Sequence, residues 1–221
     1  MRARFVVQVL AVLVVGLPGA SVAWAQPARD VRLSPVEVGV GLTINAIFAD
    51  VNALPNCQTL SLPCTHNRSG SSGGFGAALS VAGNLNEHLA VAGDFNVFGA
   101  GWDSPQSVLA RRSEVDRVRS ALVGVRVSTG FFYPGNHDPT PGRFFAEALA
   151  GGQGSDAVPL RPSWVVGAGA DVILHRHDPA AGPTLAPALR MALDYQLTPG
   201  SGRNLSGWRA VFGVVFGARM N

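Results

Sequence analysis

Hydrophobic and polar residues alternate along most of the chain with a period of two. In the segment 36–45, Val36, Val38, Val40, Leu42 and Ile44 form one face, and glycine and polar residues form the other. Successive side chains of a β-strand point to opposite sides, so this pattern predicts a strand. Seven further segments repeat the pattern, which predicts eight strands, at 36–45, 74–85, 89–98, 120–128, 143–152, 164–174, 184–195 and 207–217.

The length and polarity of these segments indicate where the strands lie. Each has about ten residues, the length that a tilted strand needs to cross a bilayer. A soluble β-sandwich or lipocalin would need a charged outer surface, but only 14% of the residues are charged. A membrane barrel instead turns its apolar face to lipid and its small and polar residues inward, which suits the 27 glycines. We therefore predict an all-β fold, an eight-stranded antiparallel up-and-down transmembrane β-barrel with both termini periplasmic.

The connections and the aromatic residues agree with this topology. A tight turn at 84–88 follows a connection of about 25 residues at 49–73, and long connections of such barrels are extracellular. Aromatic residues at the strand ends predict two interfacial girdles. The extracellular girdle would contain Phe48, Phe75, Phe98, Trp164, Tyr195 and Trp208, and the periplasmic girdle Phe131, Phe132, Tyr133, Phe144, Phe145 and Phe216.

The first 25 residues have the three parts of an export signal. Arg2 and Arg4 precede an apolar run at 5–17, and the small residues Ala23 and Ala25 precede Gln26. The apolar run is shorter than the roughly 20 residues of a spanning helix. We expect a signal peptide at 1–25, a barrel domain at 26–221, and export to the cell outer membrane. Removal of the signal peptide leaves 15 arginines against 14 acidic residues. This near balance of charge argues against nucleic-acid binding.

The two cysteines of the chain, Cys57 and Cys64, lie seven positions apart in the first long connection. In an oxidising compartment two such isolated cysteines are expected to form a disulfide. A zinc site would need two more ligands, and only His66 is near in the sequence.

Several short motifs, taken in order, resemble a known family. They are the turn at 84–88 with LAVAGDF at 89–95, GVRVS at 124–128, FFAEALAGG at 144–152, ALRMALDYQLT at 188–198 and GVVFG at 213–217. Together they resemble the bacterial outer-membrane β-barrel domain family, the eight-stranded group related to the OmpA transmembrane domain. The resemblance implies a fold more than an activity. It also implies insertion by the outer-membrane assembly machinery, although here five residues follow Phe216 where such barrels usually end on an aromatic.

The inner face of the predicted strands carries eight charged residues. An eight-stranded barrel is just wide enough to be filled by side chains, so we expect these charges to pair with one another and with Asn45, Asn96 and Ser128 as a polar plug. A conduction path or a binding site is the alternative. The eight residues are Glu37, Asp94, Arg126, Glu147, Asp171, Arg190, Asp194 and Arg209.

The sequence leaves the biological role open between three classes. The first is a structural or surface-interaction protein, in which the first long connection would act as an adhesin. The second is a small lipid-modifying enzyme, which would need a Ser, a His and an acid at the membrane rim; no histidine is convincingly placed for this, so we expect no catalytic residues. The third is a narrow porin.

The expected partners are membrane lipid and lipopolysaccharide, whose phosphates Arg111, Arg112, Arg117 and Arg119 could bind. Glu114 and Asp116 lie between these arginines and could pair with them instead. We expect a monomer without a cofactor. We also expect no metal site, because the His-Asp pairs near 137 and 177 have the sequence context of turns.

Overall fold

The computed structural model describes residues 26–28, 31–50, 69–102, 114–133, 140–156, 158–174, 184–199 and 205–220. The described residues form strands and connections, and no helix long and apolar enough to cross a membrane occurs among them. Eight strands are long: β2 (Val31–Asp50), β3 (Ser69–Asn84), β4 (Leu89–Trp102), β5 (Glu114–Ser128), β7 (Gly142–Ser155), β8 (Arg161–Ile173), β9 (Thr184–Leu197) and β10 (Gly207–Met220). Two more, β1 (Gln26–Pro27) and β6 (Phe132–Tyr133), have two residues each.

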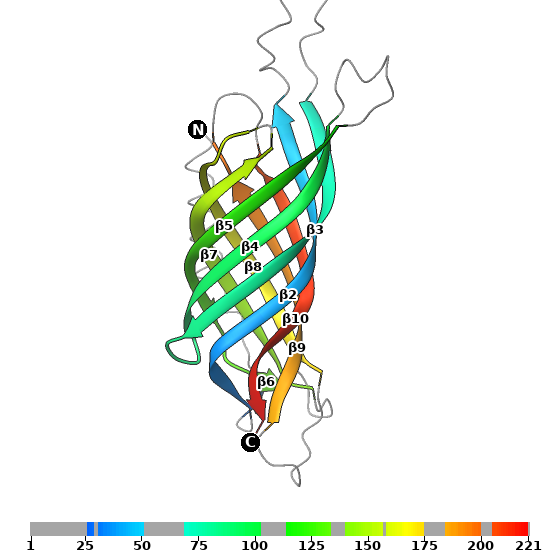
Figure 1. Cartoon of the computed structure of the whole chain (residues 1–221). Coiled ribbons are helices and arrows are strands. Elements are labelled where there is room, and N and C mark those ends of the chain that lie inside the picture. Colours follow the sequence, from blue (N-terminus) through cyan, green and yellow to red (C-terminus); the bar gives the residue numbers. More distant parts are fainter. Residues whose placement is uncertain are drawn as a thin grey trace, which may run out of the picture.

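The eight long strands close into one antiparallel barrel (Figure 1). Each pairs with the next one along the chain, from β2 through β5, β7, β8 and β9 to β10. Strand β10 then pairs with β2, so that Val214 lies opposite Val40 and the ring is complete. The short strands β1 and β6 pair with each other beside the end of β7. This architecture confirms the predicted eight-stranded up-and-down barrel.

The strands are longer than the alternation in the sequence predicts. Strand β2 has 20 residues, where the pattern marks 36–45. Strand β4 continues to Trp102 and β5 begins at Glu114, so the connection between them is shorter than the predicted 99–119. The pattern marks only the part in which one face is apolar, whereas ladder hydrogen bonds continue wherever two backbones lie side by side.

We call the end of the barrel at which β2 begins and β10 ends the terminal end, and the opposite end the first-loop end. At the terminal end, β3 and β4 are joined by the tight turn at 85–88, where backbone amides of Leu85 and Asn86 both donate to the carbonyl of Leu89. The first-loop end carries the connection between β2 and β3.

The outer surface of the barrel is a continuous apolar belt. All five alternating residues of β2 are exposed, with Leu42 at 70% and Val40 at 54%. The belt continues around the ring through residues such as Val125 on β5, Leu193 on β9 and Phe212 on β10. A closed ring leaves no unpaired strand edge, and an apolar outer surface suits lipid rather than water. The barrel is therefore a transmembrane barrel.

Apolar residues close the interior near both ends. The outer apolar cluster, at the first-loop end, consists of Ile47, Phe98, Val118, Val158 and Leu205, all at most 4% exposed. The inner apolar cluster, at the terminal end, consists of Ala28, Val31, Ile173, Ala186, Ala188 and Ala218, with Phe131 and Tyr133 packed against it.

The predicted aromatic girdles are partly wrong. Phe75, Trp164, Trp208, Phe144 and Phe216 face outward as predicted. Phe98 and Phe145, however, are each only 2% exposed and lie inside the barrel. Both have the same parity as inward polar neighbours, Asn96 and Glu147, so strand periodicity outweighs position along the strand. The side chain of Phe48 lies outside the described part of the chain. The disulfide between the two cysteines and the signal peptide also lie outside it, so both stay predictions.

Candidate functional site: the charged lumen

Among the residues that the structure describes, nine charged side chains lie inside the barrel, each at most 9% exposed. They form two groups along the barrel axis. The Glu37 cluster consists of Glu37, Arg126, Arg143, Glu147, Asp171 and Arg190. The Arg209 triad consists of Asp94, Asp194 and Arg209. Each of the eight long strands except β3 contributes at least one of these residues.

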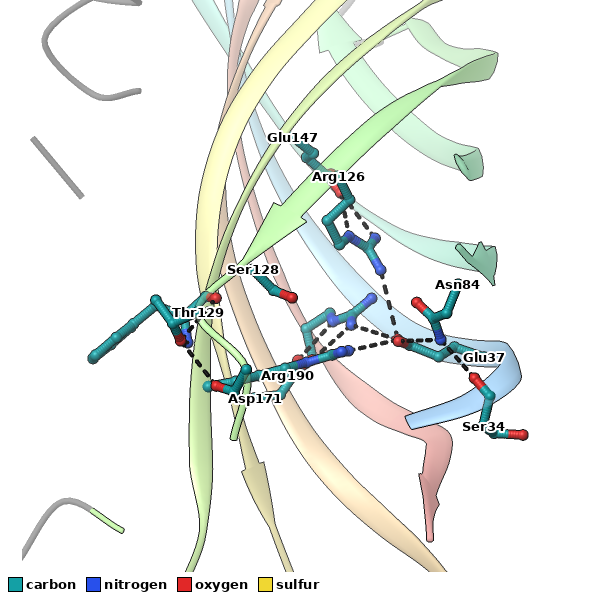
Figure 2. A network of polar contacts seen from close by, with 12 residues as sticks. Ser34, Glu37, Asn84, Arg126, Ser128, Thr129, Glu147, Asp171 and Arg190 are labelled. Atoms are coloured by element: carbon teal, nitrogen blue, oxygen red, sulfur yellow. Dashed lines mark hydrogen bonds and ion pairs between the residues drawn. The ribbon is translucent and has the colours of Figure 1, made fainter. Parts of the chain in front are cut away.

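Glu37 of β2 lies at the centre of the Glu37 cluster, where three guanidinium groups meet it (Figure 2). Its Oε2 is 2.6 Å from Nη2 of Arg143, 3.3 Å from Nη2 of Arg190 and 3.7 Å from Nη1 of Arg126. Its Oε1 accepts a 2.9 Å hydrogen bond from Nδ2 of Asn84. Both carboxylate oxygens of this buried residue are therefore satisfied by partners on other strands.

Asp171 of β8 is held by two of the same arginines. Nε of Arg190 donates to Oδ1 at 2.7 Å and Nη2 donates to Oδ2 at 2.7 Å, which is the bidentate geometry of a strong charged pair. Nε of Arg143 also donates to Oδ2, at 2.8 Å. Asp171 lies opposite Arg143 and Arg190 in the strand registers, so ladder pairing alone brings the three residues together.

Arg126 of β5 makes the contact with Glu147 that the sequence predicts. The two residues lie opposite each other in the register of β5 and β7. Nε and Nη2 of Arg126 both donate to Oε2 of Glu147, at 3.0 and 2.8 Å. The Phe145 ring contacts two guanidinium groups, with its centroid 4.9 Å from Cζ of Arg126 and 4.7 Å from Cζ of Arg190. These cation–π contacts explain why an aromatic ring is stable among charges.

Arg209 of β10 joins two carboxylates on opposite walls of the barrel. Its Nε and Nη2 donate to Oδ2 of Asp194 on the adjacent strand β9, at 2.9 and 2.7 Å. Its Nη1 donates to Oδ1 of Asp94 on β4, at 2.5 Å. The second contact crosses the lumen, because β4 and β10 are not neighbours in the sheet.

Uncharged polar residues continue the network toward the first-loop end. The Thr43 hydroxyl donates to Oδ1 of Asn96 and accepts from Nδ2 of Asn45, both at 3.0 Å. Further along, the Ser163 and Thr198 hydroxyls are hydrogen-bonded, Gln196 donates to Ser163, and Thr198 donates to Gln153. Asn45 and Asn96 therefore bond to other uncharged polar residues. The third expected partner, Ser128, donates instead to the carbonyl of Glu87 at the terminal end.

All eight charged residues assigned to the lumen from the sequence lie there. Arg190 contacts Asp171 and Glu37, and Arg209 contacts Asp194, within the partners expected. The contact between Arg209 and Asp94 was not expected. Arg143 is a ninth charge that the prediction from the sequence does not include. It is the first residue of the predicted segment 143–152, and its parity with Glu147 is the signal that places it inward.

The described residues contain no group of three His, Cys, Asp or Glu side chains suited to chelating a metal ion. The His-Asp pairs near 137 and 177, and Arg111 and Arg112, lie outside the described residues. His88 is in the turn at 85–88, where its Nδ1 is 3.1 Å from the carbonyl oxygen of Ser128.

No protein-family model and no curated protein matches the chain, but several solved structures are similar in backbone shape. Neisserial surface protein A (NspA) has 13% sequence identity and a TM-score of 0.47, over 86% of this chain and 98% of that one. The outer membrane protein OprG from Pseudomonas aeruginosa has 8% identity and a TM-score of 0.45, over 84% and 97%. Ail, the attachment invasion locus protein of Yersinia pestis, has 11% identity and a TM-score of 0.41, over 85% and 99%.

Proposed function

We propose that the protein is an outer-membrane barrel with a closed lumen, whose role is structural or in surface interaction. The observation that carries the proposal is the Glu37 cluster, in which side chains from β2, β5, β7, β8 and β9 meet across the barrel. Ions would have to pass through these contacts. Breaking even one such buried pair costs about 3 to 5 kcal/mol, so the network is expected to persist.

The two apolar clusters support the same proposal. Phe98 and Leu205 are buried near the first-loop end, and Ile173 and Ala218 near the terminal end. An ion entering from either side would first have to leave water for an apolar surface, which is costly. A narrow porin, the alternative, needs a continuous polar path.

Single-channel recording in planar bilayers tests the closed lumen directly. We expect the purified wild-type barrel to show no conductance above the background of protein-free membranes. The matched variant is Glu37→Ala, which removes the carboxylate that three arginines contact. Regular conductance steps in the wild type would overturn the proposal in favour of a porin.

The proposal includes no catalytic role. The alternative of a lipid-modifying enzyme requires a Ser, a His and an acid at the membrane rim. Among the described residues the one histidine is His88, whose near neighbours are the Ser128 carbonyl and Glu87. Release of fatty acid from phospholipid or lipid A by purified protein would contradict the proposal, and the variant His88→Ala would then show whether this residue takes part.

The surface-interaction role concerns the first-loop end. Arg117 and Arg119 are exposed on β5, and Nη2 of Arg119 is 3.5 Å from Oδ1 of Asp156, with both side chains more than half exposed. A pair so exposed is weak and can exchange for a lipopolysaccharide phosphate. Retention of lipopolysaccharide by the wild type, reduced in Arg117→Gln/Arg119→Gln, would support this partner. Equal retention by both would contradict it.

The second measurement for this role concerns the long connection between β2 and β3. A variant in which an Asn-Gly turn replaces 51–68 keeps the described strands complete, because Asp50 and Ser69 are opposite each other in the antiparallel ladder and two residues are enough to join them. We expect it to fold like the wild type and to lose adhesion to host-cell or matrix surfaces. Unchanged adhesion by a folded variant would place the interaction elsewhere.

A further inference from the structure

The charges inside the barrel do not balance in the described part of the chain. The nine buried charged side chains found there comprise five carboxylates and four guanidinium groups. The Glu37 cluster has three of each and is neutral. The excess negative charge is therefore located in the Arg209 triad, where Arg209 alone serves both Asp94 and Asp194.

The geometry of the triad shows which oxygen lacks compensation. Both hydrogen bonds from Arg209 to Asp194 go to Oδ2. Oδ1 of Asp194 is buried, and no donor among the described residues is within hydrogen-bond distance of it. It lies beside Gly167 of β8, at a place where any other residue would carry a side chain. An unpaired carboxylate oxygen in a dry interior is costly.

Asp194 also lines a cavity of about 20 Å³. This volume is enough for one particle the size of a water molecule. Small residues form much of its wall, and the space exists because they carry no side chain or only a methyl group. They are Gly39 and Gly41 of β2, Ala192 of β9 and Gly213 of β10. Its polar lining consists of Ser80 and of three carboxylates and three guanidinium groups, those of Asp94, Glu147, Asp194, Arg126, Arg190 and Arg209. Arg126 and Arg190 bind the carboxylates of the Glu37 cluster, so Arg209 is the arginine of this lining that serves Asp94 and Asp194.

We propose that the Arg209 triad binds one monovalent cation, a proton or an alkali ion, at the carboxylate of Asp194. The ligand supplies the single positive charge that the lumen lacks. A divalent ion fits less well, because the excess is one charge and no three acidic, His or Cys side chains of the described residues are arranged to chelate a metal. The proposal goes beyond the closed lumen, since a conducting barrel would have the same charge excess.

The experiment measures stability against the two sources of the charge. Urea unfolding of the protein in detergent is followed by the mobility difference between folded and unfolded barrel on unheated gels. In one arm, sodium or potassium chloride replaces choline chloride at constant ionic strength and pH. In the other, pH is varied in choline chloride. The variants are Asp194→Asn, which removes the excess charge, and Asp171→Asn, which leaves the arginines of the Glu37 cluster in excess.

We expect the wild type to gain stability in one of the two arms, either as the alkali ion concentration rises or as the pH falls. Above the dissociation constant, the ratio of folded to unfolded protein should rise about tenfold for each tenfold increase in the ligand. Asp194→Asn should be at least as stable as the wild type and lack this response. Asp171→Asn should be less stable and keep it. An alkali response identifies a metal ion, and a pH response a proton.

Two results would overturn the proposal. One is an equal response of the wild type and Asp194→Asn in both arms. The other is a loss of stability in Asp194→Asn as large as that in Asp171→Asn. If Asp194→Asn does not fold, Asp94→Asn removes the same excess charge and takes its place. The wild type also gives a direct measurement. An infrared band of a buried protonated carboxyl group supports the site, and so does broadening of the sodium NMR line. The absence of both signals overturns the proposal.

Discussion

Gly167 lies opposite Asp194 in the register of β8 and β9, and its missing side chain leaves the room that the Asp194 carboxylate occupies. A β-carbon at position 167 would overlap Oδ1 of Asp194. The variant Gly167→Ala therefore has to displace a carboxylate that Arg209 holds with two hydrogen bonds. We expect a loss of about 1 to 3 kcal/mol in unfolding free energy, the usual cost of overpacking, measured by urea titration of gel mobility.

Gly83→Ala is the matched control for that variant. Gly83 also lies within a strand, β3, but a β-carbon there would have nothing within 4 Å. Alanine should be neutral or stabilising by up to about 1 kcal/mol, because glycine loses more backbone freedom on folding. Equal effects of the two alanines would show that the space at Gly167 is not needed by Asp194.

Removing Arg126 should destabilise the barrel strongly. Arg126→Ala leaves Glu147 without its two hydrogen bonds and removes one of the three arginines around Glu37. An uncompensated buried carboxylate costs about 3 to 5 kcal/mol, and the urea midpoint should fall accordingly.

The control for Arg126 is Arg119, an arginine of the same strand that forms an exposed ion pair. Arg119 pairs with Asp156 at 3.5 Å, with side chains 55% and 63% exposed. Arg119→Ala should change the unfolding free energy by less than about 1 kcal/mol. If Arg126→Ala is as mild as Arg119→Ala, the Glu37 cluster contributes little to stability.

Strand periodicity accounts for most of what could be predicted. The alternation in β2 placed Val40 outside and Glu37 inside, because a residue's side of a strand depends only on parity. The same rule places Phe145 and Arg143 inside as well. Their position near the end of a strand favours a girdle or a connection instead, and parity outweighs it.

Contacts across the lumen could not be predicted in the same way. The pair of Arg126 and Glu147 joins adjacent strands, so strand order was enough to expect it. Arg209 and Asp94 lie on strands that are not neighbours, and their contact depends on the curvature and stagger of the closed ring. The sequence carries no local signal of that distance.

The predicted disulfide between Cys57 and Cys64 can be tested by chemistry alone. Mass spectrometry of non-reduced protein from an oxidising compartment should show both thiols blocked and a mass two hydrogens below that of the reduced chain. Closing this short ring should stabilise the protein by about 2.5 kcal/mol in the chain-entropy estimate, and Cys57→Ser/Cys64→Ser provides the comparison. Two free thiols would contradict both the pairing and the expected export.

The apolar belt predicts that an outward charge is costly only where it meets the hydrocarbon of the bilayer. Leu189 is the sixth of the 14 residues of β9, and its side chain is 37% exposed on the outer face. Leu189→Arg should lower the unfolding free energy in lipid vesicles by about 2 to 4 kcal/mol, the cost of arginine near the midplane.

Leu160 provides the control at another depth. It is 77% exposed and lies in the connection between β7 and β8, at the first-loop end. An arginine there reaches water or lipid phosphate, so Leu160→Arg should cost no more than about 1 kcal/mol. The same two variants in a short-chain detergent should differ less, because detergent adapts its thickness around a charge. Equal costs for the two variants in vesicles would mean that residue 189 does not face hydrocarbon, and the orientation of β9 derived from Arg190 and Asp194 facing inward would then be wrong.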